Sequence, residues 1–288
     1  MPALRQWIAG LWAGILVFTV SCGGVEMELP VSIAAPDRPE GARGGAAVMD
    51  QVASLPLAER EAVLVREVLA GNVPTWLRQW HTVELPGPDA PRVTVWVLSD
   101  YLTVGSDEDF VLIPLTPASA QKIADAWSAL LPTPRIVDAV WAQADVRLGN
   151  DSIPPSAAMT SIPVFRDHDA RVRTRRARRA VSPGVLTAGH KKDVVLTPEV
   201  ADRPDRVFIY GWHRPTGDPI QPLYGGHDDS WVDYSHGIRL VSRWAEVDGR
   251  RVDLEELLGQ PAYAPLFSDR GPLAVTRYRV DRGGDATK

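Results

Sequence analysis

The only cysteine of the 288-residue chain, Cys22, directly follows an apolar segment near the N-terminus. Every later residue lacks a thiol, so disulfide bonds, cysteine nucleophiles and thiolate metal ligands are excluded from the rest of the chain. Hydrophobic residues make up 45% of the sequence and charged residues 23%, which is the balance of an ordinary globular protein. The net charge of −5 argues against a nucleic-acid binder.

The apolar segment has the features of a secretory signal. Residues 1–7 carry one arginine and the terminal amine, and a run of 13 mostly apolar residues, 8–20, follows. This run is shorter than the roughly 20 apolar residues that a transmembrane helix needs. A small residue, Ser21, precedes Cys22. Residues 1–22 therefore predict a signal peptide and export.

The end of this segment, Thr19-Val20-Ser21-Cys22, resembles the lipobox of bacterial lipoproteins, in which the cysteine is acylated and becomes the mature N-terminus. The resemblance implies a lipid anchor at Cys22 and a membrane-anchored protein of the cell envelope. The alternative is an ordinary cleaved signal. Residues 23–48 are rich in Gly, Pro and Ala without a sustained apolar period, which predicts a flexible tether.

The rest of the chain predicts an α+β fold, with a mixed sheet and helices in the N-terminal half and a β-rich C-terminal half. We expect an α+β region at 49–150, a linker with an arginine-rich segment at 151–180, a β-rich region at 181–281 and a disordered tail at 282–288. Helices are expected at 54–71, 117–131, 134–144 and 254–258. Strands are expected at 93–98, 110–115, 192–196, 206–210, 237–241 and 274–280, with a hairpin turn at Asp248-Gly249.

Two charged segments have alternative interpretations. The loop at 105–110 contains Asp107 and Asp109, which are candidate calcium ligands or, more simply, residues of a solvated turn. Six arginines lie between Arg171 and Arg179. They form either a solvated face or a contact with anionic lipid headgroups or an anionic wall polymer.

Four of the six histidines, His190, His213, His227 and His236, fall within residues 190–236, and three of them stand beside predicted strand ends. A sheet can direct side chains at its strand ends into one pocket. We therefore predict that the four histidines converge, with Asp233 beside them and with Trp212 and Trp231 as the walls of the pocket.

The segment Tyr234-Ser235-His236-Gly237-Ile238-Arg239-Leu240 resembles the SHGCIRL signature of L,D-transpeptidases, which crosslink peptidoglycan through a cysteine thiolate. The upstream His213 stands where that family carries its other histidine. The cysteine is missing here, so the resemblance implies a wall-facing pocket with different chemistry. The wider pattern of a lipobox followed by GHKKDVV and IYGWHRP is similar to uncharacterised exported bacterial lipoproteins.

Three chemistries fit this residue set. A divalent metal such as zinc is one, with His190 and His227 as ligands together with Asp233 and His236. In the second, His213 or His236 is a general base toward Ser235 or, preferably, a water, and Asp228, Asp229 or Asp233 fixes the tautomer of the histidine. The third is binding of a sugar or peptide without reaction. The substrate-binding candidates are Trp212, Gln221, Tyr224, Trp231, Tyr234 and Arg239.

These observations lead to one expected function and one alternative. We expect an exported, lipid-anchored envelope hydrolase that acts on peptidoglycan or another extracellular polymer through a histidine and aspartate pocket. The alternative is a noncatalytic glycan- or peptide-binding lipoprotein. The expected partners are the polymer and, through the anchor, the membrane, and no nucleic acid is expected.

Overall fold

The computed structural model describes residues 33–87 and 91–280. The predicted signal and lipobox, the first part of the tether and the predicted tail lie outside these residues. Within them, seven α-helices combine with sheets of parallel and antiparallel strands, so the fold is α+β, as predicted. None of the described helices is both long and apolar enough to cross a bilayer.

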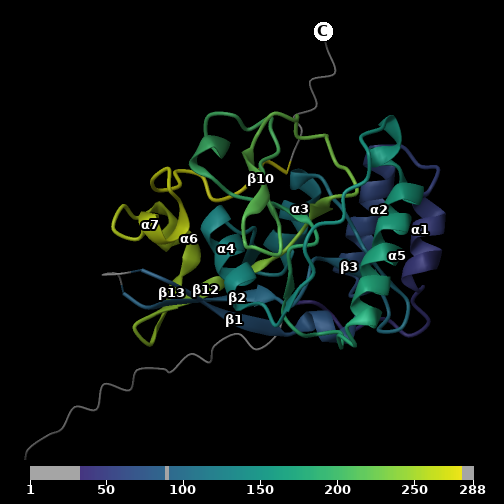
Figure 1. The fold of residues 1–288 in the computed structure, drawn as a ribbon, viewed down its shortest axis with the longest axis horizontal. Coiled ribbons are helices and arrows are strands. Elements are labelled where there is room, and N and C mark those ends of the chain that lie inside the picture. Colours follow the sequence, from purple (N-terminus) through teal and green to yellow (C-terminus); the bar gives the residue numbers. More distant parts are fainter. Residues whose placement is uncertain (1–32, 88–90, 281–288) are drawn as a thin grey trace, which may run out of the picture.

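The largest sheet is built from both halves of the chain (Figure 1). Its strand order is β1 (Trp80–Leu85), β2 (Val93–Leu98), β12 (Val241–Val247) and β13 (Arg250–Asp253), and β5 (Ala129–Leu130) also pairs with β12. All residues of β2 except Thr94 are buried, as is typical of a central strand. Because β2 pairs directly with β12, the predicted regions 49–150 and 181–281 share one sheet rather than forming separate units.

A second sheet carries Trp212, His213, Gln221, Tyr224 and His236 of the predicted site residues. Its order is β10 (Pro219–Tyr224), β9 (Ile209–His213), β8 (Lys192–Val194) and β11 (His236–Gly237). The pairs β10–β9 and β9–β8 are antiparallel, whereas β8 and β11 are parallel. Two small sheets complete the β structure: β3 (Thr103–Gly105) with β4 (Phe110–Leu112), and β6 (Val146–Arg147) with β7 (Thr187–Ala188).

The helices lie on two sides of the molecule. At the right of Figure 1 are α1 (Gly45–Val52), α2 (Leu57–Leu69) and α5 (Ile162–Arg178), and at the left are α6 (Leu254–Gly259) and α7 (Ala264–Phe267). Between them lie α3 (Pro117–Ala126) and α4 (Pro134–Gln143), each with proline in its first turn. The side chains of Thr116 and Thr133 cap α3 and α4 by accepting backbone N–H bonds.

The acidic loop between β3 and β4 organises the neighbouring helix starts. Asp107 accepts hydrogen bonds from the backbone N–H of Thr75 at 2.6 Å and from its hydroxyl at 2.5 Å, at the start of the 3₁₀ turn Thr75–Arg78. Asp109 accepts from the N–H of Ala46 at 3.0 Å, in the first turn of α1. Both carboxylates therefore satisfy helix N-termini, which accounts for them without calcium.

Several expectations from the sequence are wrong in detail. The tether ends earlier than residue 48, because Ile33 is buried and α1 begins at Gly45. The helix expected at 117–131 ends at Ala126, because Ser128 has a φ of 51° and residues 129–130 pair with β12. Helix α5 begins at Ile162 and includes most of the arginine-rich segment, so the expected linker is shorter than the range 151–180 allowed. Residues 274–280 form no strand.

A pair of glycine variants tests the packing around the second sheet. Gly189 and Gly249 both have positive φ, 91° and 80°, so alanine costs about 1 kcal/mol at either position from backbone strain. A Cβ at Gly189 also overlaps the buried ring of Trp141, whereas nothing lies within 4 Å of one at Gly249. We expect Gly189→Ala to lower the free energy of unfolding by about 3 kcal/mol in urea titrations. Equal losses in the two variants would contradict this packing.

Candidate functional site

The four histidines do not converge, because His213 and His236 lie on opposite faces of the second sheet. His236 pairs across the sheet with Lys192, and Gly237 pairs with Asp193, which in turn pairs with Tyr210. Paired residues project to the same face and successive residues to opposite faces. His236 and Lys192 therefore share one face, and Asp193 and Tyr210 share the other. The prediction that His213 and His236 share one pocket is therefore wrong.

His213 lies on the Tyr210 face and is held by α4. Its Nε2 lies 3.1 Å from Oδ1 of Asp138, and the hydroxyl of Tyr210 donates to the same carboxylate at 2.9 Å. The indole of Trp141, one turn along α4, stacks on the imidazole at a centroid distance of 4.9 Å. Asp138 was not a candidate from the sequence, because a single acid in a predicted helix gives no signal of a partner on a distant strand.

Two successive left-handed residues direct His213 to that face. Gly211 has a φ of 98° and Trp212 a φ of 55°. The left-handed conformation costs a residue with a Cβ about 1–2 kcal/mol, so surrounding contacts must stabilise Trp212. Its ring packs under the ammonium of Lys192 at 4.9 Å and edge-on to Tyr234 at 6.3 Å. The side chain of Trp212 therefore lies on the His236 face, whereas that of His213 lies on the Tyr210 face.

The His236 face gathers the residues that we call the His236 cluster: Lys192, His227, Trp231, Asp233 and His236. The loop before β11 supplies Asp233, whose Oδ1 accepts from the backbone N–H of Ser235 at 2.7 Å and from its hydroxyl at 2.5 Å. Its Oδ2 accepts from the indole N–H of Trp231 at 3.3 Å. Burial opposes ionisation of Asp233, but the nearby His236, Ser235 and Lys192 outweigh it and hold its pKa below the usual value.

The imidazole of His236 is buried without a hydrogen bond. Both ring nitrogens lack a partner among the described residues, and the residue is 1% exposed. Burial lowers the pKa of His236 to about 4, against the opposite influence of Asp233. The ring is therefore neutral at pH 7 and retains a basic nitrogen that nothing in the described chain occupies. Buried polar atoms without partners are uncommon and call for an explanation.

An aromatic ledge leads from the surface toward this cluster. Tyr224 is 43% exposed, and its ring meets that of His227 edge-on at 5.3 Å. His227 in turn stacks on Trp231 at 4.7 Å, with 12° between the planes. We use the name aromatic ledge for Tyr224, His227 and Trp231. Flat partly exposed rings of this kind bind sugar rings and peptide groups.

Other predicted binding residues are structural. Tyr234 is buried, and its hydroxyl accepts from the N–H of Ile153 at 2.9 Å. Gln221 donates to the carbonyl of the adjacent Pro222 at 3.0 Å. Arg239 is 1% exposed and donates to the carbonyls of Leu98 and Thr187, each at 2.6 Å. Tyr234 and Arg239 are therefore not available to a substrate in this arrangement, whereas Gln221 is partly exposed.

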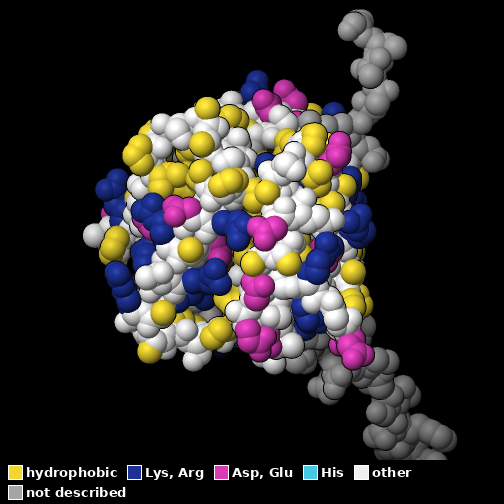
Figure 2. All heavy atoms as spheres, turned by 90° about the vertical axis from the view of Figure 1, so that its right-hand side faces the viewer, with side chains coloured by type: hydrophobic (Ala, Val, Ile, Leu, Met, Phe, Trp, Pro, Cys, Tyr) yellow, Lys and Arg dark blue, Asp and Glu magenta, His cyan; other side chains and the backbone are white. Residues whose placement is uncertain are grey.

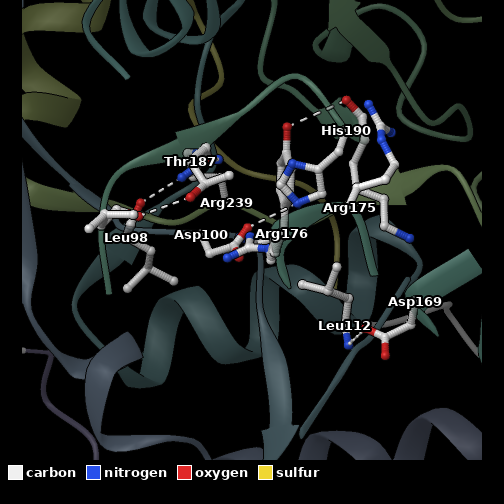
Figure 3. A network of polar contacts seen from close by, with 12 residues as sticks. Leu98, Asp100, Leu112, Asp169, Arg175, Arg176, Thr187, His190 and Arg239 are labelled. Carbon is white, nitrogen blue, oxygen red and sulfur yellow. Dashed lines mark hydrogen bonds and ion pairs between the residues drawn. The ribbon is translucent and has the colours of Figure 1, made fainter. Parts of the chain in front are cut away.

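His190 belongs to a buried ionic network (Figure 3). Its Nε2 lies 3.1 Å from Oδ1 of Asp100, and Arg176 of α5 forms an ion pair with Oδ2 of the same carboxylate. Burial opposes ionisation of Asp100, but Arg176 and His190 outweigh it and hold its pKa well below its usual range. Burial lowers the pKa of His190 to about 4. His190 therefore stabilises the interior.

Lys191 positions the candidate site, although the sequence did not indicate this role. This fully buried ammonium donates to the carbonyl of Tyr234 at 2.5 Å and lies 3.2 Å from Nδ1 of His168. Burial lowers the pKa of Lys191 to about 8, against the charges of Asp169 and Asp233. Lys191 thereby fixes the loop that carries Asp233 and His236. The run Lys191-Lys192-Asp193 was visible in the sequence, but strand alternation alone does not reveal which lysine is buried.

The described residues contain no group of three or more His, Cys, Asp or Glu side chains arranged to hold a metal ion. The four residues expected as zinc ligands illustrate this, because His190 faces Asp100 whereas Asp233 and His236 lie at the other cluster. The geometry therefore gives no preformed zinc site made from His190, His227, Asp233 and His236.

Families of known proteins, curated proteins and solved structures were all compared with the chain, and none matches it.

The buried histidines make the stability of the protein sensitive to acid. The unfolded chain takes up a proton on His236 near pH 6.5, whereas the folded chain does so only near pH 4. Stability is therefore lost as the pH falls from 6.5 to 4, by about 1.4 kcal/mol per pH unit for each such histidine. Urea titrations at several pH values should show this slope, and it should be shallower by one histidine in His236→Gln. An unchanged slope would contradict the buried neutral ring.

Proposed function

We propose that the protein is an exported, lipid-anchored hydrolase of the cell envelope that acts on peptidoglycan or another extracellular polymer. The observation that carries this proposal is the neutral, unpartnered ring of His236 beside the carboxylate of Asp233. Such a pair is suited to acid–base catalysis, because the histidine accepts a proton and the carboxylate stabilises the resulting cation.

The reaction uses a water molecule as nucleophile. A ring nitrogen of His236 takes a proton from water, whose oxygen attacks the carbonyl of an amide or ester bond, and the proton then passes to the leaving group. Lys192, half-buried beside His236, provides positive charge for the developing oxyanion. Ser235 is not the nucleophile, because its hydroxyl donates to Asp233 and it adjoins His236 in the chain.

Substrate recognition falls to the aromatic ledge. The rings of His227 and Trp231 stack beside the loop that ends at His236, so a sugar or peptide lying on them would place its neighbouring bond near the ring of His236. His236 itself is buried, and the substrate reaches it by movement of the half-exposed loop at 225–231. The similarity of residues 234–240 to the transpeptidase signature and the export signal favour peptidoglycan as the polymer.

The second candidate is the noncatalytic glycan- or peptide-binding lipoprotein. It is favoured by the exposure of Tyr224 on the ledge together with the closed position of His236. The two functions differ in their dependence on His236. A binding protein uses the ledge and tolerates a change in the buried ring, whereas the hydrolase does not.

We expect His236→Gln to reduce release of fragments from purified peptidoglycan by at least about 100-fold, because it removes the general base. Chromatography of the digest measures this release, and metal analysis of the same preparation shows whether a bound divalent ion accompanies activity. His81→Gln, in β1 of the other sheet, is the matched control and should retain activity. Retained polymer binding with no fragment release by the wild type would favour the binding function instead.

The anchor is tested separately. Cys22→Ala removes the thioether-forming residue of the lipobox, so the variant should leave the detergent phase in phase partitioning while the wild type stays in it. Globomycin, which blocks processing of bacterial lipoproteins, should cause the unprocessed form of the wild type to accumulate. A wild-type protein that is fully soluble after export would show that the signal is of the ordinary cleaved kind.

A further inference from the structure

The arginines of α5 divide into a set paired with buried carboxylates, in which Arg173 is itself exposed and Arg176 is buried, and an outward set. Arg173 pairs with the buried Asp169 at 2.9 Å, and Arg176 pairs with the buried Asp100. These two arginines stabilise the interior, so the segment is not simply a solvated face. Arg171, Arg175 and Arg178 are spaced four and three residues apart, which places them on one side of the helix.

The outward set lines a hollow with a cavity volume of about 370 Å³. Its other lining residues are Asp151, Ala170 and Thr174. The lining therefore contains three positively charged arginines and one negatively charged aspartate. Arg171 donates two hydrogen bonds to Asp151, at 3.0 and 2.7 Å, and this pair neutralises one positive charge. The hollow is left with an excess of positive charge from the other two arginines.

Most donor groups of these two arginines have no partner. Arg175 makes one hydrogen bond, at 3.3 Å to the carbonyl of Gly149, and Arg178 makes none with the described residues. Burial lowers the pKa of Arg175, with Arg179 and Arg171 adding to the effect against the opposing charge of Asp151. An anion in the hollow would relieve the repulsion among these guanidinium groups.

We propose that this hollow is a binding site for a phosphate group. Guanidinium groups match the tetrahedral oxygens of phosphate with pairs of parallel hydrogen bonds, and two arginines one turn apart can hold one such group from two sides. A flat anionic bilayer is a poorer fit. On the side of the molecule where α1, α2 and α5 lie, acidic and basic side chains are interspersed (Figure 2). The ligand is therefore a discrete phosphate, either free or as an ester in a larger molecule.

Titration calorimetry of the full chain tests the site with two probes, inorganic phosphate and the soluble diester glycerophosphoglycerol. We expect the double variant Arg175→Gln/Arg178→Gln to lose roughly tenfold or more in affinity, and wild-type binding to weaken as salt is raised. Tighter binding of the diester would identify an esterified phosphate as the ligand, and tighter binding of inorganic phosphate would identify the free ion.

The matched control is Arg66→Gln/Arg250→Gln, which removes the same charge from exposed positions outside the hollow and should bind like the wild type. Asp151→Asn should bind more tightly, because it removes the only acid from the lining. The proposal is overturned if the wild type binds neither probe, or if both double variants lose affinity equally. These measurements do not involve His236, so they are independent of the proposed hydrolase activity.

Discussion

The guanidinium of Arg239 holds the two halves of the molecule in register. It donates to the carbonyl of Leu98 at the end of β2 and to that of Thr187 in β7, and it stacks 4.5 Å above the ring of Tyr101. Asp193 of β8 lies 3.9 Å away and provides the opposite charge. A buried cation with satisfied donors specifies one arrangement of its neighbours, because any displacement leaves it unpaired. Arg239 therefore holds β8 and its neighbouring strands, which carry residues of the His236 cluster, in one position.

Local patterns predicted much of the fold. The apolar run at 93–98 is β2 with the same bounds, and α3 begins at Pro117, where the helix was expected to start. These successes depend on residues close in sequence. The shared sheet could not be predicted, because pairing of β2 with β12 joins segments far apart and no short-range signal specifies it. The early end of α3 depends on Ser128, whose backbone is left-handed and whose carbonyl accepts a hydrogen bond from the distant N–H of Arg243 at 3.0 Å.

Short-range sequence patterns predict the candidate site even less completely than the fold. The sequence correctly pointed to Asp233, His236 and Trp231 as neighbours, since they lie in one short loop. It failed for His213, because two left-handed residues before it turn the side chain to the face opposite His236, and a position at a strand end does not reveal this. It also failed to separate Arg239 from the binding residues, since a motif gives residue types but not burial. Side-chain direction at such points is a property of the folded chain.

The pairing of β2 with β12 also governs the order in which the chain can fold. About 150 residues separate the two strands, so the entropy of closing that loop must be overcome before the central sheet is complete. Synthesis proceeds from the N-terminus, so β2 can at first pair only with β1. The other edge of β2 stays unpaired until β12 has been synthesised. The first half therefore remains incompletely folded during synthesis. A chain in that state exposes apolar surface and an unpaired strand edge, so it is more prone to aggregation than the finished domain.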